Sequence, residues 1–198
     1  MRTLCLLMLS ASVLAGCSGW LIGETPRLPT MRILLDHTEV AVSDQALPQR
    51  LVISRPAVSP TLQTRAILVT QADGSLSQVS SVLWSDQPGR MLQRRLAERL
   101  AASQRFADVS TDSYRPADEI VLHVSLLRFD IEESVDGLEA IGIWELRVPG
   151  EQLEAERIAV RQMVDGTSAE AMMRTLQQVG QRMVIDAADA ILAVFAEH

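Results

Sequence analysis

The chain has 198 residues, with 18 basic and 25 acidic side chains and a formal net charge of −7. This acidic balance argues against a general nucleic-acid-binding protein, which needs a basic surface to neutralise phosphates. All the basic residues are arginine, since the sequence contains no lysine. A biased genome composition explains that choice as well as a phosphate-binding role does.

The first residues indicate a targeting segment. Arg2 precedes an apolar run, residues 4–14, that is too short to span a bilayer as a mature helix. The run ends in Leu14-Ala15-Gly16-Cys17, the tetrapeptide of a bacterial lipobox. The small residues Ala15 and Gly16 allow the pocket of the signal peptidase to close around the backbone before Cys17. We therefore predict a signal peptide over residues 1–16 and lipidation at Cys17. The alternative is an ordinary secretory signal with an incidental cysteine.

The mature chain is expected to be lipid-anchored and without a disulfide. Cys5 leaves with the signal peptide, and Cys17 is committed to lipid. Each buried acyl methylene contributes about 0.8 kcal/mol, so attachment to the periplasmic face of the envelope should be stable. Residues 17–30 contain glycines, prolines and few core-forming side chains, which predicts a lipidated tether. Residues 31–198 are expected to form one periplasmic domain.

Short extended segments are predicted in the first half of the domain. Residues 31–35 form a short apolar run, and residues 37–46 are polar and predict a loop. Strand-like patterns then occupy residues 51–53, 66–69 and 79–84. The second of these runs leads into Asp73-Gly74, which is a strong turn signal.

Two amphipathic helices are predicted. The first is expected to use Ser85 or Asp86 as its cap, to hold Pro88 in its first turn and to end near Ser103. The second is expected to begin after a cap at Ser168 and to run to the C-terminus.

Three longer strands are predicted between the helices. Residues 119–129 contain Ile120, Leu122, Val124 and Leu126 in strict alternation. Residues 138–148 and 153–163 follow, separated by a turn at Pro149-Gly150. The order of strands, helix, strands and helix predicts an α+β fold, with a mainly antiparallel sheet and both helices packed on one face.

No motif for catalysis or metal binding is found in the sequence. The histidines, His37, His123 and His198, are scattered, and no phosphate loop or nucleophile elbow is present. Glu132, Glu133 and Asp136 lie near a predicted hairpin turn at Gly137, where paired acids could serve a glycosidase. A solvated, charge-rich turn is the simpler interpretation. We expect no enzyme activity, cofactor or metal.

A basic strip is predicted on the first helix. Arg90, Arg94, Arg95 and Arg99 recur at helical spacing against one acid, Glu98. Guanidinium groups pair bidentately with phosphate and carboxylate, so the strip could contact phospholipid headgroups or an acidic partner. The alternative is a solvated helix face that pairs with acids elsewhere in the fold.

Several segments resemble the ABC-type transport auxiliary lipoprotein family, which includes the PqiC-like lipoproteins associated with MCE-domain lipid transporters. The resemblance covers roughly residues 48–196, and its most specific part is the Trp-x-Asp-x-Pro pattern that leads into the first helix. The matching segments are Leu51-Val52-Ile53-Ser54-Arg55-Pro56, Leu62-Gln63-Thr64-Arg65-Ala66-Ile67, Trp84-Ser85-Asp86-Gln87-Pro88, Ser103-Gln104-Arg105-Phe106 and the alternating strand around Leu122 to Phe129.

The resemblance implies a non-enzymatic accessory component of an envelope system for phospholipid trafficking between membranes. The expected partners are an MCE-domain protein with its permease and ATPase, and the lipoprotein would dock on the MCE protein and position it. A partner of a ring-shaped assembly could itself be a homo-oligomer. Ser18 replaces the aspartate that favours inner-membrane retention in enteric-type bacteria, so we expect the outer membrane.

Two other functions are compatible with the sequence. One is a scaffold lipoprotein for outer-membrane, lipopolysaccharide or cell-wall assembly machinery, which would have a similar domain and a different partner. The other is a lipid-anchored hydrolase whose site is assembled from distant residues. A hydrolase predicts a deep polar cleft with a perturbed acid or histidine, whereas a scaffold predicts a flat or grooved surface.

Overall fold

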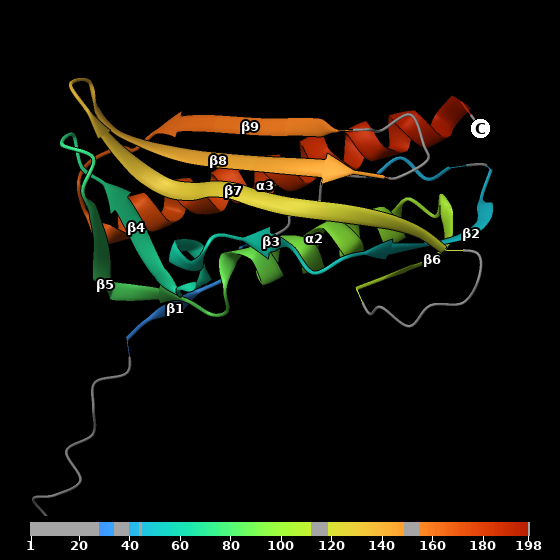
Figure 1. Cartoon of the computed structure of the whole chain (residues 1–198), viewed down its shortest axis with the longest axis horizontal. Helices are drawn as coiled ribbons and strands as arrows, with labels where there is room; N and C mark the ends of the chain where they lie inside the picture. Colours follow the sequence, from blue (N-terminus) through green and yellow to red (C-terminus); the bar gives the residue numbers. More distant parts are fainter. Residues whose placement is uncertain (1–27, 34–39, 44, 112–118, 149–154, 198) are drawn as a thin grey trace, which may run out of the picture.

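The computed structural model describes residues 28–33, 40–43, 45–111, 119–148 and 155–197. These residues form one curled sheet and two α-helices, which confirms the predicted α+β class (Figure 1). The strands are β1 (Thr30–Met31), β2 (Leu47–Ile53), β3 (Ala57–Val58), β4 (Ala66–Thr70), β5 (Leu76–Trp84), β6 (Phe106–Ser110), β7 (Glu119–Ser134), β8 (Gly137–Arg147) and β9 (Glu156–Met163). The helices are α2 (Pro88–Ala102) and α3 (Ala169–Val194), with short 3-10 turns η1 (Pro60–Gln63) and η2 (Phe195–Glu197).

The long strand β7 organises the sheet. One edge of β7 pairs antiparallel with β8, which pairs antiparallel with β9. The other edge pairs in turn with β2, β3 and β4, all of them parallel to β7. The chain from β2 to β4 therefore follows one edge of β7 along its length (Figure 1).

The sheet is mostly but not purely antiparallel. Its longest ladders, β7 with β8 and β8 with β9, are antiparallel, as predicted. The parallel pairings were not predicted, because alternation along a strand reports which face is buried and not the direction of its neighbour. Helix α2 makes them possible, since it lies between β5 and β6 and carries the chain back before β7 begins.

A β-bulge interrupts the predicted alternation in β7. Leu122, Val124 and Leu126 point into the core, but the register shifts between Leu126 and Arg128. Leu127 is consequently 45 % exposed, and the buried positions continue with Phe129. The bulge keeps apolar side chains on the helical side of the sheet although the sequence period changes there.

The two helices bury their apolar faces against the sheet and against each other. Leu92 and Leu96 of α2 are fully buried. On α3, Val179 lies over Gly142 of β8, where an added Cβ would lie 2.7 Å from the Val179 Cγ1 atom. A side chain larger than glycine would thus separate β8 from the helix. In the described part of the chain, neither helix is both long and apolar enough to cross a bilayer.

The helix boundaries confirm one predicted cap and correct the other. Ser168 caps α3, because its Oγ accepts a hydrogen bond from the backbone N–H of Ala171 at 3.1 Å. The prediction of Ser85 or Asp86 as the cap of α2 was wrong, since Gln87 occupies that position without a side-chain cap. The backbone carbonyl of Gln87 accepts hydrogen bonds from the N–H groups of Arg90 and Met91 at 3.0 and 3.1 Å, so the first turn closes without a side-chain cap.

Two short strands, β3 and β6, were not predicted because they lack a long apolar run. The turn at Asp73-Gly74 is confirmed: Gly74 has a φ of 82°, and hydrogen bonds from Ser75 lower the pKa of the Asp73 carboxyl. The predicted turn at Pro149-Gly150 and parts of the segments 31–35 and 37–46 lie outside the described residues.

Candidate functional site

The four arginines of the predicted basic strip occupy different environments. Arg99 is only 8 % exposed, and one Nη atom lies 3.6 Å from a carboxylate oxygen of Asp189 on α3. Arg95 donates from Nε to the backbone carbonyl of Ile33 at 2.9 Å and pairs with Glu98 at 2.5 Å. These two arginines therefore connect α2 to neighbouring segments.

Arg90 and Arg94 lie on the surface at the start of α2. The Arg94 side chain is 55 % exposed and lies 3.8 Å from a carboxylate oxygen of Asp86. Arg90 is exposed and has no ion-pair partner within the described ranges. Pairing with acids, the alternative interpretation of the strip, thus accounts for Arg94, Arg95 and Arg99 and leaves Arg90 available.

Arg55, which was not singled out in the sequence as a site residue, lies beside Arg90. The two side chains line one concavity of about 280 Å³ between the segment after β2 and the start of α2. Arg55 is exposed and, in the residues the structure describes, likewise has no ion-pair partner. In the sequence, the only sign that Arg55 is an exposed site residue was its place between a buried strand and Pro56.

Backbone and side-chain contacts hold this concavity in shape. The N–H of Ser54 donates to the carbonyl of Leu122 at 2.8 Å, and the buried Gln93 amide donates to the carbonyl of Ile53 at 2.9 Å. Gly89 allows α2 to approach β3, because a Cβ there would lie 3.1 Å from Cγ1 of Val58. The arginines are therefore presented by a fixed junction of strand and helix.

Two neighbouring concavities extend the positive region. One, of about 270 Å³, is lined by Arg55, Arg90 and Arg94 among others. The other, of about 410 Å³, brings Arg32 beside Arg94, with Asp86 and Glu98 also in its lining. We call the exposed arginines of these three concavities the basic surface: Arg32, Arg55, Arg90 and Arg94.

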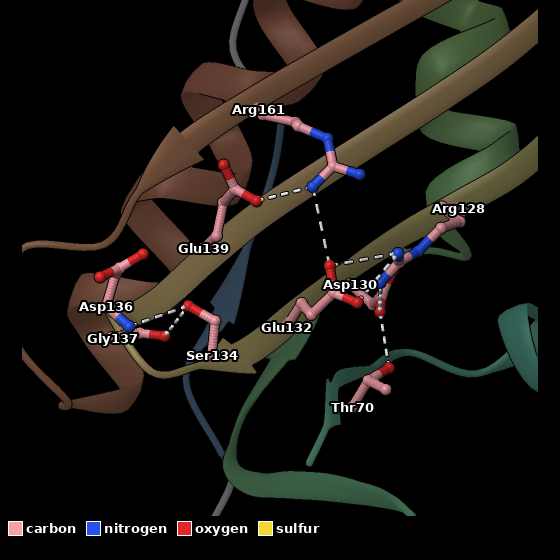
Figure 2. Close-up of polar contacts among 9 residues, drawn as sticks. All are labelled: Thr70, Arg128, Asp130, Glu132, Ser134, Asp136, Gly137, Glu139 and Arg161. Atoms are coloured by element: carbon pink, nitrogen blue, oxygen red, sulfur yellow. Dashed lines mark hydrogen bonds and ion pairs between the residues drawn. The ribbon is translucent and has the colours of Figure 1, made fainter. Parts of the chain in front are cut away.

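A second group of arginines lies on the face of the sheet that points away from the helices (Figure 2). Arg128 donates from Nε and Nη to the two carboxylate oxygens of Asp130, at 3.0 and 2.7 Å. Thr70 on β4 donates to the same carboxylate at 2.8 Å, and Asp130 is only 5 % exposed. The hydrogen bonds to Asp130 raise the pKa of the Arg128 guanidinium.

Further ion pairs continue this group across β8 and β9. Arg161 lies 2.7 Å from Glu139 and 3.7 Å from Glu132, and Arg128 reaches Glu132 at 3.4 Å (Figure 2). We call the set the ion-pair network: Thr70, Arg128, Asp130, Glu132, Glu139 and Arg161. It joins four strands, and its arginines are already neutralised by acids.

The acids considered as a glycosidase pair belong to this surface and to the adjoining turn. Glu132 is held by two arginines, while a carboxylate oxygen of Glu133 accepts a 3.4 Å hydrogen bond from the N–H of Ala72. Asp136 is in the predicted hairpin turn, which the structure confirms with a φ of 124° at Gly137. The arrangement matches the charge-rich turn expected as the simpler interpretation.

The remaining candidates are dispersed or undescribed. His123 is exposed on β7, opposite Arg147 of β8. No group of three or more potential metal-ligating side chains occurs among the residues with described positions. Cys17, His37 and His198 lie outside them.

Solved structures with a similar fold include three proteins of low sequence identity. The Xanthomonas campestris protein XCC0632, from the family model DUF330, has a TM-score of 0.66 and 15 % identity, covering 86 % of this chain and 96 % of that one. An uncharacterized protein has a TM-score of 0.62 and 17 % identity over 83 % and 99 % of the two chains. The hypothetical protein CT253 from Chlamydia trachomatis has a TM-score of 0.54 and 9 % identity over 77 % and 100 %. At these identities the likeness concerns the fold alone.

Sequence comparison identifies the family. No curated protein matches the chain in sequence. The model of a family described as "ABC-type transport auxiliary lipoprotein component" matches residues 34–188. That range includes α2, most of α3 and every strand from β2 to β9. The chain belongs to the ABC-type transport auxiliary lipoprotein family.

Proposed function

We propose that the protein is a lipid-anchored accessory component of an MCE-type ABC transport system for phospholipid trafficking between membranes. It acts by docking on the MCE-domain protein, which works with a permease and an ATPase, and by positioning that protein at one membrane. The observation that carries the proposal is the family match over residues 34–188. A component of this kind contributes position and contact and has no catalytic role.

The anchor is Cys17, lipidated after removal of residues 1–16. Residues 17–30 then form the tether of a periplasmic domain, residues 31–198, at the outer membrane. A cysteine of this kind carries two or three acyl chains. They attach the protein stably, whereas one acyl chain alone binds a membrane only weakly and reversibly. A stable anchor suits a protein whose task is to hold a partner in place.

The rigidity of the domain supports a positioning role. β7 is paired along both edges, and its 16 residues span roughly 50 Å at the usual rise of a strand. Arg105 connects the segment before β2 to the residues after α3, because its guanidinium donates to the backbone carbonyls of Gln45 and Phe195. A partner bound at one end of this body would be held at a defined distance from the other.

Affinity purification of the tagged, lipidated protein from gently solubilised envelopes tests the proposal. We expect an MCE-domain protein with its permease and ATPase to be recovered. Recovery of outer-membrane, lipopolysaccharide or cell-wall assembly factors without an MCE protein would contradict the proposal and favour a scaffold lipoprotein. A purified protein that hydrolyses envelope substrates would favour the hydrolase.

A Cys17→Ser variant is the matched control for anchoring. Labelled palmitate should enter the wild-type protein and not the variant, and the variant should leave the membrane fraction. Labelling of the variant, or its retention in membranes to the wild-type extent, would contradict an anchor at Cys17.

A further inference from the structure

We propose that the basic surface binds the anionic phospholipid headgroups of the membrane that holds the anchor, and so turns the start of α2 toward that membrane. The inference rests on the proposed function in one respect, the lipid anchor at Cys17. It adds a second contact with the membrane and a fixed orientation of the domain.

The first argument is the availability of charge. Arg55 and Arg90 are exposed, line one concavity and have no ion-pair partner among the described residues. Among the described residues, the ion-pair partner of Arg94 is Asp86, at 3.8 Å. A guanidinium free of carboxylate can form two parallel hydrogen bonds with a phosphate without first breaking an ion pair.

The second argument is the chemistry of the concavity. Its lining combines the exposed Arg55 and Arg90 with apolar side chains that are buried or half-buried, those of Pro56, Val58 and Leu62. A phospholipid has the same order of groups, with a charged phosphate above a glycerol backbone and the first methylenes. A volume of about 280 Å³ accommodates part of a headgroup and no complete lipid.

The third argument is the place where the chain leaves the domain. Pro29 accepts a hydrogen bond from the N–H of Leu83 at 3.0 Å, and Met31 accepts one from the N–H of Ser85 at 2.7 Å. The N-terminal segment is thus fixed beside the start of α2, and Arg32 shares a concavity with Arg94. Figure 1 shows β1 near the beginning of α2, on the side opposite β9.

The tether keeps this surface near the bilayer. From Cys17 to residue 28 the chain can reach at most roughly 40 Å if fully extended, and a flexible chain is shorter on average. Electrostatic attraction acts over a Debye length of about 8 Å at physiological ionic strength. A surface beside the end of the tether meets the headgroups more often than one at the far side of the domain.

The charge of the rest of the protein favours one orientation. The whole chain has a net charge of −7, so most of its surface is repelled by an anionic membrane. The basic surface is a positive exception beside the tether. An acidic protein would also complement it in charge, but the adjacent tether favours the bilayer.

Vesicle flotation tests the inference. The probe is the mature chain carrying Cys17→Ser, mixed with vesicles of phosphatidylcholine alone or with about one third phosphatidylglycerol. We expect binding to the anionic vesicles and little to the neutral ones, with a loss on the order of fivefold in affinity for each arginine replaced. The test variant is Arg55→Gln/Arg90→Gln.

A matched control separates the site from net charge. Arg147 and Arg157 are exposed arginines of β8 and β9, without an ion-pair partner in the described segments. Arg147→Gln/Arg157→Gln therefore makes the same change in charge outside the basic surface, on strands at the other edge of β7, and should reduce binding less than twofold. Circular dichroism should show all variants folded. Arg55→Lys/Arg90→Lys should retain most of the binding, because it keeps the charge.

Each other outcome would overturn the inference. If both double glutamine variants lose the same affinity for anionic vesicles, binding depends on net charge and not on the basic surface. If the wild-type protein binds neutral and anionic vesicles equally, the headgroup charge is not what it recognises. Binding of inorganic phosphate without vesicle binding would identify a free anion as the ligand. Loss of MCE-protein recovery by Arg55→Gln/Arg90→Gln, with vesicle binding unchanged, would assign the surface to an acidic partner. Failure to recover an MCE protein with the wild type concerns the proposed function instead, since flotation uses no partner.

Discussion

Two arginine-rich regions of the same domain differ in what surrounds the guanidinium groups. In the ion-pair network, Arg128 and Arg161 lie beside acids on their own strand or on a paired strand. On the basic surface, Arg55 and Arg90 lie on a loop and a helix start and form no ion pair with a described residue, although Asp86 lines a concavity with them. The difference shows that the neighbours, and not the number of arginines, separate a structural cluster from a candidate binding surface.

The geometry of a sheet explains this difference. Alternate residues of a strand share a face, and residues opposite each other on paired strands lie about 5 Å apart. Arg128, Asp130 and Glu132 therefore meet on one face of β7, and Arg161 reaches Glu139 across the β8–β9 ladder. A loop and a helix N-terminus impose no such register, so their arginines pair only where an acid happens to lie close.

Removal of the buried acid of the ion-pair network should have the largest effect. Asp130→Ala leaves Arg128 without its bidentate partner and Thr70 without its acceptor, so we expect the free energy of unfolding to fall by about 2–3 kcal/mol. Urea denaturation measures this. The control Asp136→Ala in the exposed hairpin turn should cost less than about 0.5 kcal/mol. Equal effects of the two variants would contradict the structural role of the network.

Replacement of the buried arginine of α2, Arg99, should have the second-largest effect on stability. Arg99→Ala removes a side-chain stem packed between helices, and we expect a loss of about 1–2 kcal/mol in the free energy of unfolding. Arg99→Met should recover most of that loss, because the partner Asp189 is 62 % exposed and stays hydrated without the pair. If Arg99→Met is as unstable as Arg99→Ala, the charge is what stabilises this contact.

An outer member of the network should contribute less. The Arg161 side chain is 52 % exposed, so its two ion pairs are screened by solvent. Arg161→Gln should reduce the free energy of unfolding by about 0.5–1 kcal/mol, and the difference from wild type should shrink at roughly 1 M NaCl. Thermal denaturation at low and high salt measures it. A difference that grows with salt would contradict an electrostatic origin.

The smallest effect on stability is expected at the basic surface. Arg55→Gln/Arg90→Gln breaks no ion pair in the described structure, and we expect the free energy of unfolding to change by less than about 0.5 kcal/mol. The same urea experiment checks this. A loss above about 1 kcal/mol would mean that these arginines hold the fold, and would remove the contrast with the ion-pair network.

The sequence predicted the elements better than their arrangement. The alternation in β7 as far as Leu126 and the cap Ser168 are local signals, and both were confirmed. The bulge after Leu126 and the parallel neighbours of β7 depend on pairing between distant segments, which alternation does not encode. The predicted cap of α2 was wrong because the helix begins at Pro88, and the Asp86 carboxylate accepts from the N–H of Gln87 instead of from the helix.

The candidate site was only half predictable for a similar reason. Helical spacing placed Arg90 and Arg94 close together, but it also grouped them with Arg99, which packs against α3 in the interior. Arg55 joins the site through the packing of β3 on Gly89 of α2, a contact between segments far apart in sequence. Spacing reports which residues share a helix face, whereas exposure depends on what the fold places against that face.

The depth of labelled positions in a membrane tests the central claim most directly. The lipidated protein is reconstituted in anionic vesicles containing a nitroxide-labelled lipid, with a fluorophore on a single introduced cysteine, Gln63→Cys or Asp136→Cys. Gln63 lines the concavity of Arg55 and Arg90, and Asp136 lies in the β7–β8 turn, beyond the basic surface. We predict strong quenching at position 63, weak quenching at position 136, and loss of the difference in Arg55→Gln/Arg90→Gln. Equal quenching, or stronger quenching at position 136, would contradict an orientation set by the basic surface.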